Sequence, residues 1–187
     1  MIKNEKDPLV WELLETEHAI HDEWIDLRIS SYRFPDGKVY APFYTYSRKD
    51  DVVVVASDEE GRYICVKQYR QGIGKVTTEF PAGGIELQDV SLEDALAAAK
   101  RELLEETGYV SDEWKYMMKI AANATICDNY EYLFIAKNCR KVAGQSLDVT
   151  EFVNVERYTS QELEQLIAMG EFQQAMHITA WLLSQRQ

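Results

Sequence analysis

The stretch Glu79–Tyr109, EFPAGGIELQDVSLEDALAAAKRELLEETGY, predicts a strand, a glycine-containing loop and one amphipathic helix. Ser91 and Asp94 have the spacing of a capping box, which begins a helix by satisfying its first backbone N–H groups. Gly108 is well placed to end the helix in a left-handed conformation. We therefore expect one helix from about Ser91 to Gly108, with the loop before it.

The end of this helix carries three glutamates on neighbouring positions of one face, namely Glu102, Glu105 and Glu106. Arg101 stands four residues before Glu105 and is expected to pair with it, which leaves Glu102 and Glu106 to reach one side together. Like charges so close destabilise each other, and a divalent cation with hard oxygen ligands would offset them. Spacing alone leaves a second interpretation open, an ordinary solvated helix with intrahelical salt bridges.

The loop Pro81–Gly84 is expected to pass close to the helix, because its glycines let the backbone approach. A carbonyl of this loop, that of Ala82 for instance, could add one more oxygen to the site. A set of oxygen ligands suits Mg²⁺ or Mn²⁺, which grip phosphates, and such ions activate water and neutralise phosphate charge.

Composition narrows the class of protein. The chain has 187 residues, of which 46% are hydrophobic and 28% charged, as expected for one globular domain or one domain with an appendage. A net charge of −12 argues against nucleic-acid binding through a basic surface. We find no apolar run near the length of a membrane span, no apolar signal core and no CxxC spacing among the three cysteines. We therefore expect a cytoplasmic protein that is not membrane-bound.

The remaining pattern predicts strands that alternate irregularly with helices. Residues 1–20 are predicted as a short amphipathic helix, followed by a hairpin of strands at 24–32 and 38–47 whose many aromatic residues favour a dimer contact. A buried strand at 51–57 and another at 63–69 precede the central stretch, and helices at 159–169 and 171–186 close the chain. Because no regular βαβ rhythm is present, we expect a mixed sheet.

The helical half of the central stretch resembles the Nudix box. That pattern is a glycine, five residues, a glutamate, seven residues, then Arg-Glu-U-x-Glu-Glu-x-Gly-U, in which U is apolar. Residues Arg101–Tyr109, RELLEETGY, match every specified position, and Glu93 stands seven residues before Arg101. Gly83 is separated from Glu93 by nine residues instead of five, which indicates a longer loop across Ile85–Leu92.

Further segments resemble the ADP-ribose pyrophosphatase branch of that family: FPDG, VKQYR, EFPAGGIE and DVTEFVNVERY. The resemblance implies an α/β fold, an α/β/α sandwich around a mixed β-sheet with an N-terminal antiparallel β-hairpin extension. Residues 1–47 would be a dimerisation element of helix and strands, and residues 48–187 the Nudix hydrolase domain. The implied activity is Mg²⁺-dependent hydrolysis of the pyrophosphate in ADP-ribose or a related nucleotide sugar, by a homodimer. The alternative is a catalytically weak Nudix-fold regulator that binds such a ligand.

The resemblance also implies roles for individual residues. Arg101 would support the acids in catalysis, and substrate contacts would come from Arg70, Glu79 and Arg28. The general base stays open between Asp148, Glu151 and a group elsewhere. The implied metal ligands, of which the glutamates are also catalytic, are Ala82, Glu102, Glu105, Glu106 and Glu151.

Overall fold

The computed structural model describes residues 7–87 and 90–186. The chain divides into two compact units, each with its own contacts. The first, here the N-terminal unit, contains the described residues through Arg48 together with Ala121–Asn129. The second, here the sandwich unit, contains the described residues of Lys49–Ile120 and those from Tyr130 onward.

The N-terminal unit is built on a three-stranded antiparallel sheet in the order β1-β2-β3. Its strands are β1 (Glu12–His21), β2 (Asp26–Arg33) and β3 (Val39–Ser47). The predicted hairpin is confirmed in β2 and β3, where Gly37 takes the left-handed conformation, with φ of 84°, and donates a hydrogen bond to the Phe34 carbonyl. The aromatic residues of the hairpin thus lie on paired strands.

The helix predicted for residues 1–20 is wrong over the described part of that range, because residues 12–21 form β1. A single short helix is marginal in water, whereas a strand here pairs with β2 along its length, with two register shifts. Trp11 lies just before the strand, and its ring centroid is 4.0 Å from that of Phe34 and 5.3 Å from that of Phe43. Tertiary pairing therefore outweighed local propensity. Residues 1–6 lie outside the described part.

The sandwich unit contains a mixed sheet in the order β11-β5-β4-β10-β8, with β6 on β5, β7 on β4 and β9 on β10. The predicted mixed character is confirmed, because β4 runs parallel to β10 and antiparallel to β5. The bounds are β4 (Asp51–Asp58), β5 (Tyr63–Arg70), β6 (Lys75–Glu79), β7 (Ala82–Gly84), β8 (Tyr109–Val110), β9 (Glu113–Ala121), β10 (Tyr130–Lys141) and β11 (Asn154–Tyr158).

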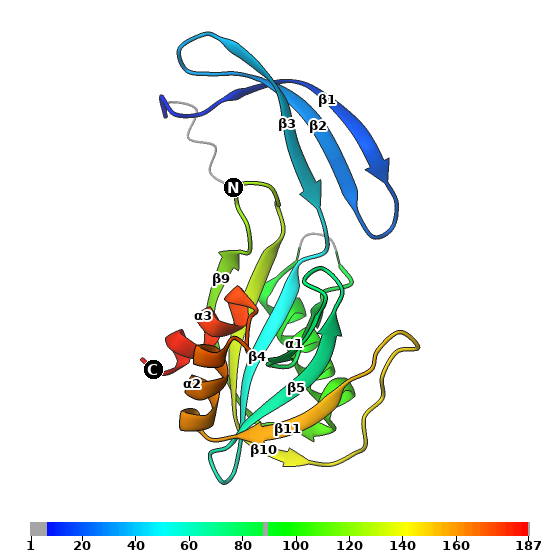
Figure 1. Ribbon diagram of the computed structural model, residues 1–187, viewed down its shortest axis with the longest axis vertical. Helices are drawn as coiled ribbons and strands as arrows, with labels where there is room; N and C mark the ends of the chain where they lie inside the picture. Colours follow the sequence, from blue (N-terminus) through cyan, green and yellow to red (C-terminus); the bar gives the residue numbers. More distant parts are fainter. Residues whose placement is uncertain (1–6, 88–89, 187) are drawn as a thin grey trace. The chain divides into compact units, whose positions relative to one another are not determined.

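Helices cover both faces of this sheet, as the α/β/α prediction requires (Figure 1). Val52 and Val54 of β4 pack towards α1 (Leu92–Thr107), while Val53 and Val55 pack towards α2 (Ser160–Met169) and α3 (Ala175–Ser184). Burial on both sides explains the continuous valine run of this strand. No helix formed by the described residues is both long and apolar enough to cross a lipid bilayer.

The last helix begins later than predicted, at Ala175 instead of residue 171. The residues before it are engaged with β6. The Thr78 N–H donates to the Glu171 carbonyl at 2.8 Å, and the Gln173 N–H donates to Thr77 Oγ1 at 3.3 Å. These hydrogen bonds join residues that are far apart in the sequence, and they keep the residues just before Ala175 in a non-helical conformation.

Candidate active site

Local signals position the helix that carries the acids. Ser91 Oγ accepts from the Asp94 N–H, and the Asp94 carboxylate accepts from the Ser91 N–H, both at 3.1 Å, which completes the predicted capping box. At the other end, Gly108 has φ of 76° and donates to the Leu104 carbonyl at 2.8 Å. With both ends of α1 placed, its last turns face the sheet.

The acid pair lies on the buried side of α1. Glu102 is 7% exposed and Glu106 is 4% exposed. Burial raises the pKa of Glu102 to about 7 and that of Glu106 to about 8, because a carboxylate out of water is costly. Their mutual repulsion adds to the rise for Glu106. The ordinary solvated helix is therefore excluded here, since a solvated face would not bury two acids.

Arg101 joins the acids to the loop before the helix. Its guanidinium contacts Glu105 at 2.8 Å, as predicted from the spacing, and donates to the Gly84 carbonyl at 3.0 Å. It also contacts Glu102 at 2.7 Å, although spacing alone left that residue unpaired. Of the three glutamates at the end of α1, Arg101 contacts Glu102 and Glu105, and no ion pair joins it to Glu106 in the described part of the chain. Arg101 thus partly neutralises the cluster and holds the loop against α1.

The loop strand β7 lies directly against the acids. The Ala82 N–H donates to Glu106 Oε2 at 3.0 Å, so the observed contact of Ala82 is through its amide. A Cβ at Gly83 would lie 2.2 Å from Glu102 Cδ. Glycine at this position therefore lets the Glu102 carboxylate approach the backbone, as the sequence predicted for the loop, and a larger residue would displace that carboxylate.

A late loop brings a third acid to the cluster. The negative charge of Glu151 raises the pKa of both Glu102 and Glu106. Gln145 donates to the Glu106 carbonyl at 2.8 Å, which ties the start of this loop to the end of α1. Asp148 is exposed, and its N–H donates to Glu151 Oε2 at 2.9 Å. The charge of Glu151 therefore acts on both of the predicted acids.

Arg70 and Glu79 lie on the neighbouring strands β5 and β6 and bind each other. Arg70 Nε lies 2.9 Å and 3.0 Å from the two Glu79 carboxylate oxygens. Glu79 is fully buried, whereas the Arg70 side chain is one-third exposed. The positive charge of Arg70 partly offsets the rise in the pKa of Glu106 that burial causes. Of this predicted pair, Arg70 is the one that can meet a ligand, and Glu79 orients it.

The third predicted substrate residue, Arg28, belongs to the N-terminal unit. Its guanidinium donates to Asp128 Oδ2 at 2.8 Å, within the same unit. Arg28 is therefore held by an ion pair between β2 and the loop Ala121–Asn129.

One supporting residue escaped prediction as part of the site. His177 of α3 is buried, and its Nδ1 accepts a hydrogen bond from the Phe80 N–H at 3.1 Å. Burial lowers the pKa of His177 to about 3, so the ring is neutral and able to accept. It supports the chain between β6 and β7. Spacing could not reveal it, since 97 positions separate the two residues.

The donor set fits a hard divalent cation. Two buried carboxylates and Glu151 offer oxygen atoms, and burial raises the pKa of Glu102 and Glu106, so a cation bound beside these two would stabilise their charged form. Carboxylate oxygens are the ligands that Mg²⁺ and Mn²⁺ prefer. Glu102, Glu106 and Glu151 are the residues of this site that would hold such an ion.

Comparison with known proteins gives a family and a fold. The sequence model of the NUDIX domain matches residues 47–181. The ADP-ribose pyrophosphatase of Bacillus subtilis (strain 168) is 29% identical over 156 residues, which cover 83% of this chain and 82% of that protein. The methanol dehydrogenase activator of Bacillus methanolicus is 29% identical over 155 residues, covering 82% and 81%.

A solved structure described as an ADP compounds hydrolase superimposes with a TM-score of 0.81. The match covers 95% of this chain and 94% of that chain, at 18% sequence identity. At that identity the likeness establishes the shared fold.

Proposed function

The chain belongs to the NUDIX domain family, and from this premise we propose that it hydrolyses the pyrophosphate bond of a nucleoside diphosphate derivative, ADP-ribose or a related nucleotide sugar, with Mg²⁺ or Mn²⁺ as cofactor. The observation that carries the proposal is the buried pair Glu102 and Glu106, set against β7 and joined by Glu151. The ADP-ribose pyrophosphatase of Bacillus subtilis supports the substrate class.

Cation binding falls to the acids. Glu102, Glu106 and Glu151 would hold the ion, with Glu105 beside them and the Ala82 carbonyl as a further oxygen. When bound, a divalent ion neutralises charge on the pyrophosphate and acidifies water. Binding also relieves the acids themselves, because their carboxylates are repelled by one another and separated from solvent.

The other residues bind the substrate, orient the acids and accept a proton from water. Arg70, held by the fully buried Glu79, presents a fixed guanidinium to a substrate phosphate. Arg101 keeps Glu102 and Glu105 in position through its two ion pairs. Asp148 or Glu151 takes the proton from the attacking water, and the hydrogen bond between them orients the Glu151 carboxylate.

The N-terminal unit completes the proposal. Its strands, within residues 1–47, would form the dimerisation element of a homodimer, and residues 48–187 the catalytic domain. Arg28 of this unit stays a predicted substrate contact. Size-exclusion chromatography with light scattering tests the dimer, and a chain of monomeric mass would contradict it.

The test is a screen of nucleoside diphosphate sugars with Mg²⁺ and with Mn²⁺. A coupled phosphatase converts released monophosphates to inorganic phosphate, and mass spectrometry identifies the products. We expect Glu106→Gln to lower turnover by a factor on the order of 100 or more. The matched control is Glu164→Gln, the same change at an exposed position of α2. Full activity in Glu106→Gln would sink the assignment.

The regulator interpretation has its own outcome in that screen. Tight binding of a nucleotide sugar by the wild-type protein, with no turnover under either metal, would favour a ligand-binding role. The retained acid cluster argues against it, since a pure binding protein has no need to bury mutually repelling carboxylates.

A further inference from the structure

A second group of metal-binding side chains lies in the N-terminal unit, at the end of the β1–β2 hairpin. It consists of His18 and His21 of β1 and Asp26, the first residue of β2. His21 and Asp26 form the last registered pair before the turn. Asp22 closes that turn by accepting from the Trp24 and Ile25 N–H groups. The cluster therefore sits on a well-defined piece of backbone.

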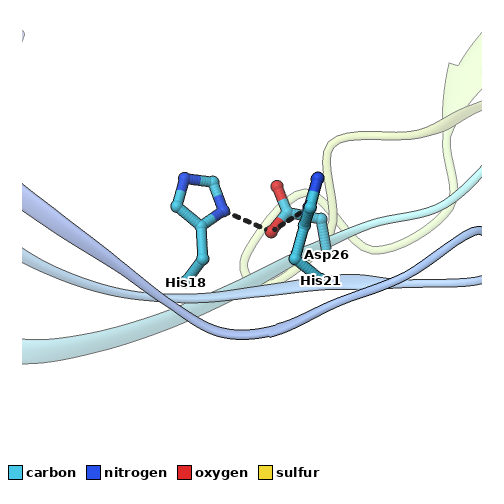
Figure 2. Close-up of side chains that lie close together, drawn as sticks. All are labelled: His18, His21 and Asp26. Carbon is cyan, nitrogen blue, oxygen red and sulfur yellow. Dashed lines mark hydrogen bonds and ion pairs between the residues drawn. The ribbon is translucent and has the colours of Figure 1, made fainter.

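A β-bulge brings the two histidines together. In a regular strand, residues three apart point to opposite faces of the sheet. The pairing of β1 with β2 shifts register between His18 and Ile20, so β1 carries one extra residue there. As a result the His18 and His21 side chains rise on the same side of the ribbon, together with Asp26 (Figure 2).

The ligand atoms converge on one carboxylate oxygen. His18 Nδ1 lies 2.6 Å and His21 Nδ1 3.3 Å from Asp26 Oδ1. The three ligand atoms all lie within 4.8 Å of one another. Tetrahedral ligands about 2.0–2.1 Å from zinc are separated by about 3.3 Å. The His21 and Asp26 atoms have that separation, whereas His18 Nδ1 lies closer to Asp26 Oδ1 and would have to move away to share an ion. Both histidines are exposed, which leaves the site open to ions and to water.

Asp26 is less exposed than the two histidines. Its side chain is only 18% exposed, and its second oxygen lies 3.9 Å from Arg28 Nε. Oδ1 is thus the oxygen turned to the rings, and Oδ2 faces a fixed cation. A positioned carboxylate between two imidazoles needs little reorganisation to bind an ion.

We propose that His18, His21 and Asp26 bind a divalent transition-metal cation such as Zn²⁺, with water completing the coordination. Two imidazole nitrogens with one carboxylate oxygen suit Zn²⁺, whereas Mg²⁺ takes oxygen ligands. The chain therefore carries two cation sites that differ in ligand chemistry. A bound ion would join β1 to β2 across the turn. This inference is independent of the proposed hydrolysis.

The test is a Zn²⁺ titration of the full chain against a chromophoric chelator, in a Glu102→Gln, Glu106→Gln background that removes the oxygen site. We expect one bound equivalent. His21→Gln and Asp26→Asn, each added to this background, should weaken binding about tenfold or more, while Glu17→Gln, on the same exposed strand, should leave it unchanged. Unaltered affinity after both His18 and His21 are replaced would overturn the proposal.

Imidazole NMR of the unmutated protein gives an answer that does not depend on variants. The chain has three histidines, and the third, His177, is buried in the sandwich unit. Zn²⁺ should shift the ring nitrogen signals of His18 and His21 and leave those of His177 in place. If neither of the two exposed histidines responds, the residues form only a hydrogen-bonded group and the site does not exist.

Discussion

Replacing Glu106 with glutamine should stabilise the metal-free protein in alkaline solution while removing its activity. The carboxylate is 4% exposed, and burial raises its pKa from 4.5 to about 8. Glutamine has nearly the same shape, and its side-chain oxygen can still accept from the Ala82 N–H. The substitution therefore removes a buried charge and keeps the packing.

The size and the pH range of the effect follow from the pKa of Glu106. In the unfolded chain the carboxyl loses its proton near pH 4.5, but in the folded chain near pH 8. Between these values the native state binds more protons, so wild-type stability falls as pH rises, and glutamine escapes this loss. At about 1.4 kcal/mol per pH unit the full difference is worth about 5 kcal/mol, and relaxation around the charge reduces it to a few kcal/mol.

The assay is thermal unfolding of both proteins in EDTA at pH 5 and pH 9. At about 2–4 °C per kcal/mol, Glu106→Gln should melt roughly 5–15 °C above wild type at pH 9 and close to wild type at pH 5. Adding Mg²⁺ at pH 9 should raise the wild-type melting temperature more than that of the variant. Glu164→Gln should show neither effect. The reasoning is falsified if the two melting temperatures differ equally at both pH values.

Three further substitutions and one control probe the residues that support the site. Gly83→Ala should displace the Glu102 carboxylate and lower turnover about tenfold or more, while Gly84→Ala, with no side-chain atom nearer than 3.7 Å, should leave turnover unchanged. Arg70→Met should lower the free energy of unfolding, measured with urea, by about 3–5 kcal/mol, because the fully buried Glu79 carboxylate loses its cation. A decrease below about 1 kcal/mol would contradict this. As pH falls from 7 to 5, the wild-type free energy of unfolding should fall by about 2 kcal/mol relative to that of His177→Gln. The reason is that histidine binds a proton in the unfolded chain but not in the folded one, where its pKa is about 3. Parallel curves of unfolding free energy against pH would refute this.

The helix at the centre was predictable because its signals are local. Ser91 and Asp94 are three residues apart, and Gly108 bonds to a carbonyl one turn back, so each contact falls within a few residues along the chain. The acid spacing follows from helix geometry, and the match of Arg101–Tyr109 to the Nudix box indicated the family to which the domain belongs. The buried valine strand was predictable from its hydrophobic pattern and the mixed sheet from the lack of a regular βαβ rhythm, whereas the two helical layers were implied by the resemblance.

The first strand could not be predicted in the same way. Residues 12–21 are rich in helix-forming residues, and their strand conformation depends instead on pairing with β2 and on the aromatic contacts of Trp11. The bulge that aligns His18 with His21 is a property of that pairing and leaves no trace in spacing. Long-range partners decided this segment.

By itself, then, the sequence determined the helix, its caps and the four-residue repeat of its acids, because these rest on contacts within one or two turns. Only the tertiary structure decided the burial, the neighbours and the pKa values of these acids. It buried Glu102 and Glu106, and it packed Gly83 against the first and the Ala82 amide against the second. It also let the charge of Glu151, from a loop far along the chain, act on both. The physical reason is that a carboxylate acquires an altered pKa from burial and from neighbours across the fold, and neither can be read from the chain around it.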